Sequence, residues 1–123
     1  MAQDLNTSKT FLLTEAIKEA GWTKDALDHN QTLNNPFGVN KINSKGKASG
    51  NVAYSSLDAA IDYWKGQFGD QVRGTQTAQD FINGLEYPPP GGHRVNPYPD
   101  KYVPAYLQDY STMVKFMKLC GIQ

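Results

Sequence analysis

The apolar residues in positions 10–20 recur at the spacing of an amphipathic helix. Two of the chain's three glutamates lie in this helix. Thr7 or Ser8 is placed to cap its start, and Gly21 is placed to end it with the left-handed backbone that glycine adopts most easily. A helix advances about 100° per residue, so its apolar positions form one buried stripe. We expect this stripe to consist of Leu12, Leu13, Ala16, Ile17 and Ala20.

Glu19 is the residue that this helix singles out. The chain has only three glutamates, Glu15, Glu19 and Glu86. On the helical wheel Glu19 lies at the border of the stripe, beside Leu12 and Ala16, whereas Glu15 is expected to face solvent. Partial burial raises the pKa of a carboxyl group and keeps it protonated nearer neutral pH, as a general acid requires. Glu19 is therefore a candidate general acid, and an ordinary carboxylate at the edge of a helix is the alternative.

Length, charge and cysteine content limit the classes of protein. A chain of 123 residues suits one domain with a hydrophobic core, so we expect residues 1–123 to form a single domain. Twelve basic and twelve acidic residues, without a run of Lys and Arg, argue against a nucleic-acid partner. Cys120 is expected to be a buried thiol. His29 and His93 lack a third spaced ligand, so we expect neither a metal nor a cofactor.

The rest of the chain is predicted to be helical, with one ribbon and one long loop. Residues 37–54 contain three glycines among polar and β-branched residues, which predicts a small exposed β-hairpin. Apolar spacings of three and four predict helices over about 55–68 and 77–86. The stretch 87–100 is too rich in Pro and Gly for regular structure, and Pro104 is expected to begin the last helix. The expected core positions in these helices include Trp64, Phe81, Ile82, Leu85, Tyr106, Leu107, Tyr110, Met113, Val114 and Met117.

Three motifs in a fixed order carry a family resemblance. Residues 16–22 read Ala-Ile-Lys-Glu-Ala-Gly-Trp, residues 34–39 read Asn-Asn-Pro-Phe-Gly-Val, and residues 52–56 read Val-Ala-Tyr-Ser-Ser before a helix with a tryptophan. In this order they resemble the bacterial peptidoglycan N-acetylglucosaminidases of glycoside hydrolase family 73 and their flagellar-rod relatives. The likeness spans about residues 10–117. It implies a mainly α, α+β fold class: a lysozyme-like helical body with a small β-hairpin lobe flanking an active-site cleft.

The resemblance also implies roles for the residues at matching positions. Glu19 stands three residues before Trp22, where the family carries its catalytic acid, and would protonate the glycosidic oxygen. Tyr54 would line the cleft as a substrate-binding residue. The family's tyrosine before the last helix has two candidate counterparts here, Tyr98 and Tyr102. The turn that begins the lobe would be shaped by Asn34, Asn35, Phe37 and Gly38.

A second carboxylate is the part of the family pattern that this chain lacks. Most glycosidases need a nucleophile or base about 5–9.5 Å from the acid, and family members are thought to place it in the lobe. No Asp or Glu occurs between Asp28 and Asp58. Asp58 is one substitute, although capping its own helix is its favoured role. Another is the substrate's own 2-acetamido group, which attacks the anomeric carbon in substrate-assisted hydrolysis.

The resemblance therefore implies a peptidoglycan glycosidase, either an endo-β-N-acetylglucosaminidase or a muramidase. Its partner would be the glycan strand, and an immunity protein would occlude its cleft in the producing cell. The alternative is a noncatalytic glycan-binding or cell-wall assembly module that keeps the fold.

The expected place of action is the bacterial periplasm or cell wall, as an antibacterial effector or lysin. Residues 1–9 lack the basic start and apolar run of a secretory signal, and no segment has the apolar length of a membrane helix. We therefore expect no membrane insertion. Delivery is expected by type VI secretion or phage lysis, or by excision of this domain from a larger protein.

Overall fold

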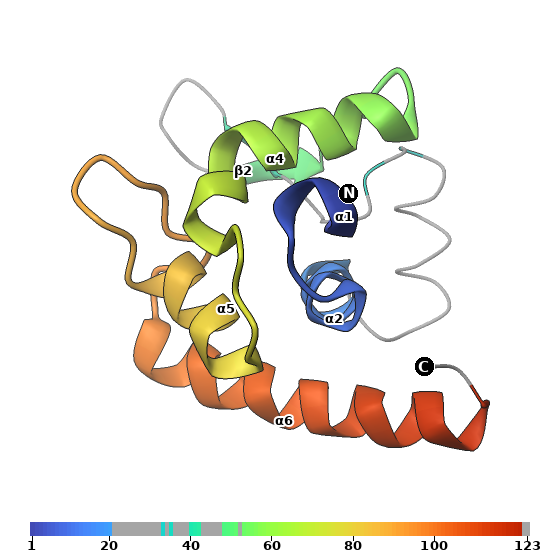
Figure 1. Ribbon diagram of the computed structural model, residues 1–123. Helices are drawn as coiled ribbons and strands as arrows, with labels where there is room; N and C mark the ends of the chain where they lie inside the picture. Colours follow the sequence, from blue (N-terminus) through green and yellow to red (C-terminus); the bar gives the residue numbers. More distant parts are fainter. Residues whose placement is uncertain (21–32, 34, 36–39, 43–47, 52, 122–123) are drawn as a thin grey trace. The chain divides into compact units, whose positions relative to one another are not determined.

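The computed structural model describes residues 1–20, 33, 35, 40–42, 48–51 and 53–121 (Figure 1). Their regular elements are α1 (Ala2–Leu5), α2 (Lys9–Ala20), β1 (Asn40–Ile42), β2 (Ala48–Asn51), α4 (Leu57–Val72), α5 (Ala78–Glu86) and α6 (Pro99–Leu119). Contacts group the chain into two compact units. Unit 1 comprises Met1–Thr14 and Lys65–Gln123, and unit 2 comprises Glu15–Trp64. That the chain forms a single domain stays a prediction.

The predicted α+β fold class is wrong, because the described residues are predominantly helical and the structure belongs to the all-α class. Within unit 2, β1 and β2 pair antiparallel, with Asn40 opposite Asn51 and Ile42 opposite Ala48, and the register between these pairs is irregular. The strands have only three and four residues. A two-stranded ribbon of this length is marginal in water by itself, so it does not amount to a β layer.

The predicted helices at 7–20, 55–68 and 77–86 are confirmed as α2, α4 and α5, and their caps explain where they begin. Ser8, Ser56 and Thr77 each accept a hydrogen bond from a backbone N–H two or three residues further on, at 3.2, 3.1 and 3.1 Å. Such caps satisfy N–H groups that the first turn of a helix leaves without a partner. The capping residues in the sequence therefore mark the helix starts through hydrogen bonds that they form in the structure.

The last helix begins earlier than predicted. Helix α6 starts at Pro99, and Pro104 lies inside it. Pro99 takes the first-turn place, where a missing N–H costs nothing. Pro104 removes the N–H that would bond to the carbonyl of Asp100, which normally weakens a helix. Burial on both sides of Pro104 maintains the helix, and the buried residues of α6 are Tyr102, Val103, Tyr106, Met113 and Met117.

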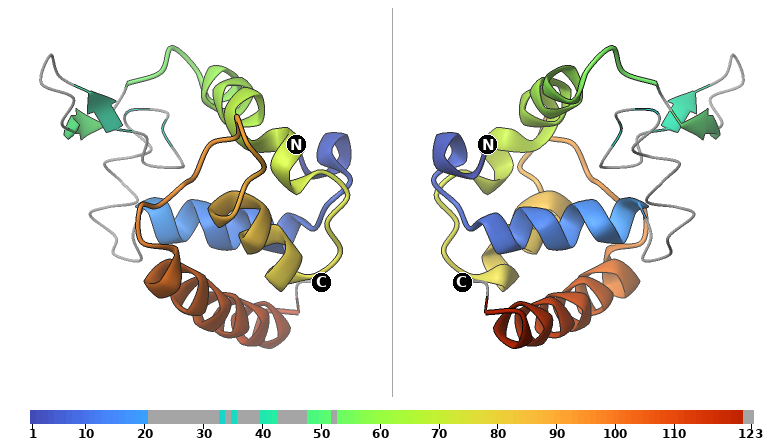
Figure 2. Two further views of the ribbon diagram at one scale, coloured as in Figure 1. Left: turned by 90° about the vertical axis from the view of Figure 1, so that its left-hand side faces the viewer. Right: turned by 90° about the vertical axis from the view of Figure 1, so that its right-hand side faces the viewer.

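Aromatic rings build the core of unit 1, in which α5 lies alongside α6 (Figures 1 and 2). The ring centroid of Phe11 lies 5.6 Å from that of Phe81 and 5.5 Å from that of Tyr110. Phe81 stacks on Tyr106 at 5.8 Å, and the Tyr106 hydroxyl donates to the carbonyl of Phe11 at 2.9 Å. The predicted inward face of α5 is confirmed, because Phe81, Ile82 and Leu85 are all 0% exposed. Trp64, in unit 2, is buried as predicted.

Helix α1 was not predicted, because Leu5 is the only large apolar residue of its four. Its place in unit 1 is fixed by tertiary contacts. Leu5 is fully buried, and its carbonyl accepts a hydrogen bond from Gly74 at 2.8 Å. The Arg73 guanidinium donates to the carbonyl of Asp4 at 2.7 Å, and Lys65 forms an ion pair with the Asp4 carboxylate at 2.9 Å.

The Asp4–Lys65 pair predicts a small dependence of stability on pH. The hydrogen bond from Lys65 and the Lys65 charge hold the pKa of Asp4 below its ordinary value of 3.8. A lowered pKa contributes stability above the unfolded-state pKa, and that stability is lost as pH falls through the folded-state pKa. We expect Asp4→Asn to lower the Tm slightly at pH 7 and to leave it unchanged at about pH 2. Thermal unfolding of both proteins measures this, and an equal loss at the two pH values would contradict the ion pair as its cause.

The C-terminal end of α6 is exposed, which corrects the prediction of a buried thiol. Cys120 is exposed at the C-cap of the helix. Phe116 and Leu119 in the same turn are 57% and 88% exposed, whereas Met117 is buried. Only the side of this last turn that carries Met117 is buried, and the Cys120 thiol is not on that side.

Candidate active site

The candidate acid lies in the second half of α2. Glu19 is partly buried in the last turn of the helix, as its position beside the apolar stripe predicted. Glu15, one turn earlier, is 0% exposed. The prediction that Glu15 faces solvent is therefore wrong.

The reason is that the buried face of α2 is rotated from the predicted stripe. Leu13, predicted to be inward, is 40% exposed, whereas Thr14 is fully buried. The Thr14 hydroxyl donates to the carbonyl of Thr10 at 2.8 Å, so the helix itself satisfies this polar group. A satisfied hydroxyl is buried at low cost, and hydropathy does not register this bond. The predicted buried stripe was therefore rotated away from the face of α2 that is actually buried. This error placed Glu15 on the solvent side.

Glu15 and Glu19 are four residues apart and share one face of α2. At that spacing in a helix, Cβ atoms lie about 5–6 Å apart. Both residues have polar or charged partners within the chain. Burial disfavours the charged form of a carboxyl group, and a nearby carboxylate disfavours it further. Sequence reasoning did not select Glu15 as a candidate site residue, although its spacing of four from Glu19 was a usable signal.

Two further predicted site residues, Asn35 and Tyr54, also belong to unit 2. Asn35 is 1% exposed. Tyr54 is half-buried, and its N–H donates to the carbonyl of Leu33 at 2.9 Å. Its ring lies 5.9 Å from that of Tyr63, at 44°. Burial, and then the charge of Tyr63, raise the pKa of Tyr54, so its hydroxyl stays a hydrogen-bond donor over a wide pH range.

The remaining predicted site residues are placed differently. Phe37 lies outside the described residues, as do Asn34, Gly38 and Trp22. Tyr98 is the N-cap residue of α6 and is 68% exposed, whereas Tyr102 is 7% exposed. Of the two tyrosines, Tyr98 is the one whose ring is accessible to a ligand.

A buried carboxyl group organises the loop before α6, within unit 1. Glu86 is 0% exposed, and its Oε2 accepts a hydrogen bond from the N–H of Asn96 at 3.0 Å. Its carbonyl accepts from Nε of Arg94 at 2.9 Å. The Gln71 amide holds the loop from α4, because it donates to the carbonyl of His93 and accepts from its N–H, both at 2.7 Å. The Pro- and Gly-rich segment is therefore an ordered loop, as predicted.

Asp58, the substitute second carboxylate, is exposed in the first turn of α4, whose cap is Ser56. In the part of the chain that the structure describes, no group of three or more His, Cys, Asp and Glu side chains is arranged to hold a metal ion. None of the described helices combines the length and apolar character of a membrane span.

Comparison with known proteins gave no match: no family model, curated protein or solved structure is similar to this chain. The resemblance to glycoside hydrolase family 73 therefore stays a prediction that depends on the three motifs.

Proposed function

We propose that the protein hydrolyses the glycan strand of peptidoglycan, with Glu19 as the general acid. The observation that carries the proposal is the partly buried carboxyl group of Glu19 in the last turn of α2, one turn from the fully buried Glu15. When the glycosidic bond breaks, the departing oxygen must gain a proton. A protonated carboxyl group beside that oxygen can supply it.

The other side chains have supporting roles in this proposal. Glu15 lies one turn from Glu19 on the same face of α2, and in its ionised form its charge would disfavour ionisation of Glu19. Asn35 and Tyr54 offer hydrogen-bond donors in the same unit, and the raised pKa of Tyr54 keeps its hydroxyl protonated.

Glu15 is not proposed as the nucleophile. A nucleophile must reach the anomeric carbon, and the Glu15 side chain is fully buried. We assign that step to the 2-acetamido group of the substrate, whose oxygen bonds to the anomeric carbon while Glu19 protonates the departing oxygen. Water then attacks the same carbon and gives a proton to the Glu19 carboxylate, while the bond between that carbon and the acetamido oxygen breaks and restores the acetamido group. The product keeps its anomeric configuration.

The test is to incubate purified peptidoglycan with the wild-type protein and with Glu19→Gln, and to identify the reducing ends. We expect soluble fragments from the wild type alone. Reducing N-acetylglucosamine identifies a glucosaminidase, and reducing N-acetylmuramic acid identifies a muramidase. Inversion at the anomeric carbon would exclude the acetamido route. Binding of glycan by both proteins, without fragments from either, would instead support the noncatalytic module.

Action in the periplasm or cell wall, delivery by type VI secretion or phage lysis, and an immunity protein over the site belong to the same proposal. A protein that cuts its host's own wall needs such an inhibitor in the producing cell. Cleavage by the purified chain is therefore the first result that these proposals need.

A further inference from the structure

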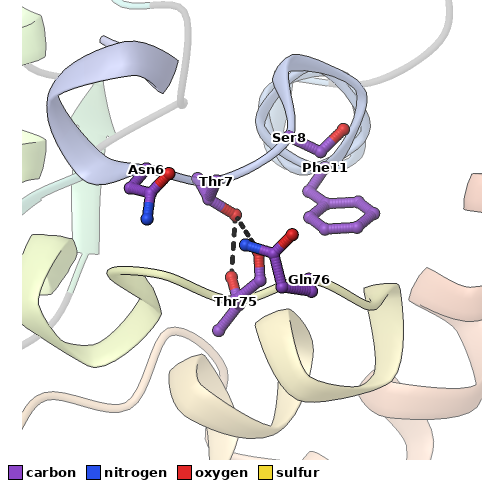
Figure 3. A pocket seen from close by; sticks show the side chains of 6 residues that line it. All are labelled: Asn6, Thr7, Ser8, Phe11, Thr75 and Gln76. Atoms are coloured by element: carbon purple, nitrogen blue, oxygen red, sulfur yellow. Dashed lines mark hydrogen bonds between the residues drawn. The ribbon is translucent and has the colours of Figure 1, made fainter.

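A polar pocket lies within unit 1 (Figure 3). Its volume is about 180 Å³. It opens between the turn that joins α1 to α2 and the segment that joins α4 to α5. The lining residues are Asn6, Thr7, Ser8, Phe11, Thr75 and Gln76.

Long-range hydrogen bonds hold the pocket in shape. The Thr7 hydroxyl donates to the Thr75 hydroxyl at 2.7 Å, and the carbonyl oxygen of Thr75, 3.0 Å away, is a second acceptor for the same proton. The hydroxyl of Thr75 also donates to the carbonyl of Val72 at 2.7 Å. The two walls are thus joined across 68 residues of sequence. When a site is already formed before binding, little binding free energy is spent on ordering its side chains. This pocket is therefore suited to a small ligand.

The lining chemistry is neutral and rich in groups that both donate and accept hydrogen bonds. None of the six lining side chains carries a charge. Phosphate and carboxylate ligands are normally bound by Arg or Lys, so an anion is a poor match. Hydroxyls and primary amides instead match sugar hydroxyls, which donate and accept at the same atom. The Phe11 ring lines the pocket but is only 4% exposed, so it closes the wall of the pocket and offers no open face for stacking.

Two side chains in the pocket have hydrogen-bonding capacity to spare. In the part of the chain that the structure describes, the exposed Asn6 amide makes no side-chain hydrogen bond, and Gln76 uses only its Nε2, which donates to Gly74 at 3.1 Å. Figure 3 shows the Gln76 amide between Thr7 and Phe11. The amide groups of Asn6 and Gln76 are therefore available to a ligand in the pocket.

We infer that this pocket binds one neutral sugar unit of a glycan, as a second binding site that does not contain Glu19. A volume near 180 Å³ equals about six water molecules, which suits a single pyranose ring and not an oligosaccharide. The choice of a peptidoglycan sugar as the ligand rests on the proposed function. Binding at the pocket does not depend on catalysis, because its lining lies wholly in unit 1.

The test is an NMR titration of the full chain carrying Glu19→Gln with tri-N-acetylchitotriose, so that no turnover intervenes. We expect shifts of the Asn6 and Gln76 side-chain amides and of the backbone N–H groups of Thr7 and Thr75. The double variant Asn6→Gly with Gln76→Ala is expected to weaken this binding at least fivefold. Asn6 has φ 50°, which glycine adopts without strain, so the double variant retains the turn.

The matched control is Gln79→Ala, which removes an exposed amide from α5 outside the pocket and should leave the titration unchanged. Equal affinity of the double variant, or no shift at the pocket, would overturn the inference. Shifts with inorganic phosphate in place of the sugar would overturn it too. Pocket shifts from a protein whose wild type cuts no peptidoglycan would refute the proposed hydrolase and leave this site standing.

Discussion

Replacing Glu19 with Gln is expected to lower kcat for glycan cleavage about 10²- to 10⁴-fold, the usual contribution of a general acid. The amide has nearly the shape of the carboxyl group but has no acidic proton for the glycosidic oxygen. KM should change little, because the substituted group acts in the transition state rather than in substrate binding. Initial rates of reducing-end release, with circular dichroism to verify the fold, measure this effect.

Glu15→Gln is the matched control on the same face of α2. It removes a carboxyl group one turn from Glu19 and keeps the side-chain volume. If Glu15 acts on Glu19 through its charge, its loss lowers the pKa of Glu19, and the alkaline limb of the pH profile moves to lower pH. Activity at the optimum is expected to be largely kept. A loss as large as that of Glu19→Gln, with no shift of the profile, would show that Glu15 itself takes part in the chemistry.

The helices that sequence reasoning located were those with both a capping residue and an apolar period. Ser8, Ser56 and Thr77 marked three starts, because a cap is a local bond that the sequence itself specifies. Helix α1 had neither signal and is held by Leu5 packing within unit 1. The start of α6 was placed at Pro104 because a proline inside a helix is unfavourable. Burial of neighbouring side chains outweighed that local preference. An argument from helix propensity does not take such burial into account.

For the candidate site, the sequence predicted the partial burial of Glu19 but not the full burial of Glu15. Glu19 could be selected because three glutamates leave few alternatives and because its helical position was clear. The burial of Glu15 depended on Thr14 turning inward, and that depends on a hydrogen bond within the helix. The choice between Tyr98 and Tyr102 depended on exposure, which is decided by packing around α6.

The largest loss of stability is expected from Gly84→Ala, a substitution that helix propensity alone would predict to be stabilising. A Cβ atom on Gly84, in α5, would overlap the backbone carbonyl oxygen of Gln71, in α4. Backbone cannot rotate away as a side chain does, so the two helices must separate. Their separation also breaks the hydrogen bond from the Gln71 amide to the Gly84 carbonyl, at 3.0 Å. We expect the free energy of unfolding in urea to fall by about 3 kcal/mol or more.

Gly66→Ala makes the same chemical change where nothing opposes it. Gly66 is exposed inside α4, and no atom lies within 4 Å of its added Cβ. Here the helix preference for alanine acts alone and should raise the free energy of unfolding by about 0.5–1 kcal/mol. The two variants should therefore move the urea midpoint in opposite directions. If both raised it, the close approach of α4 and α5 at Gly84 would be refuted, since propensity would then account for both results.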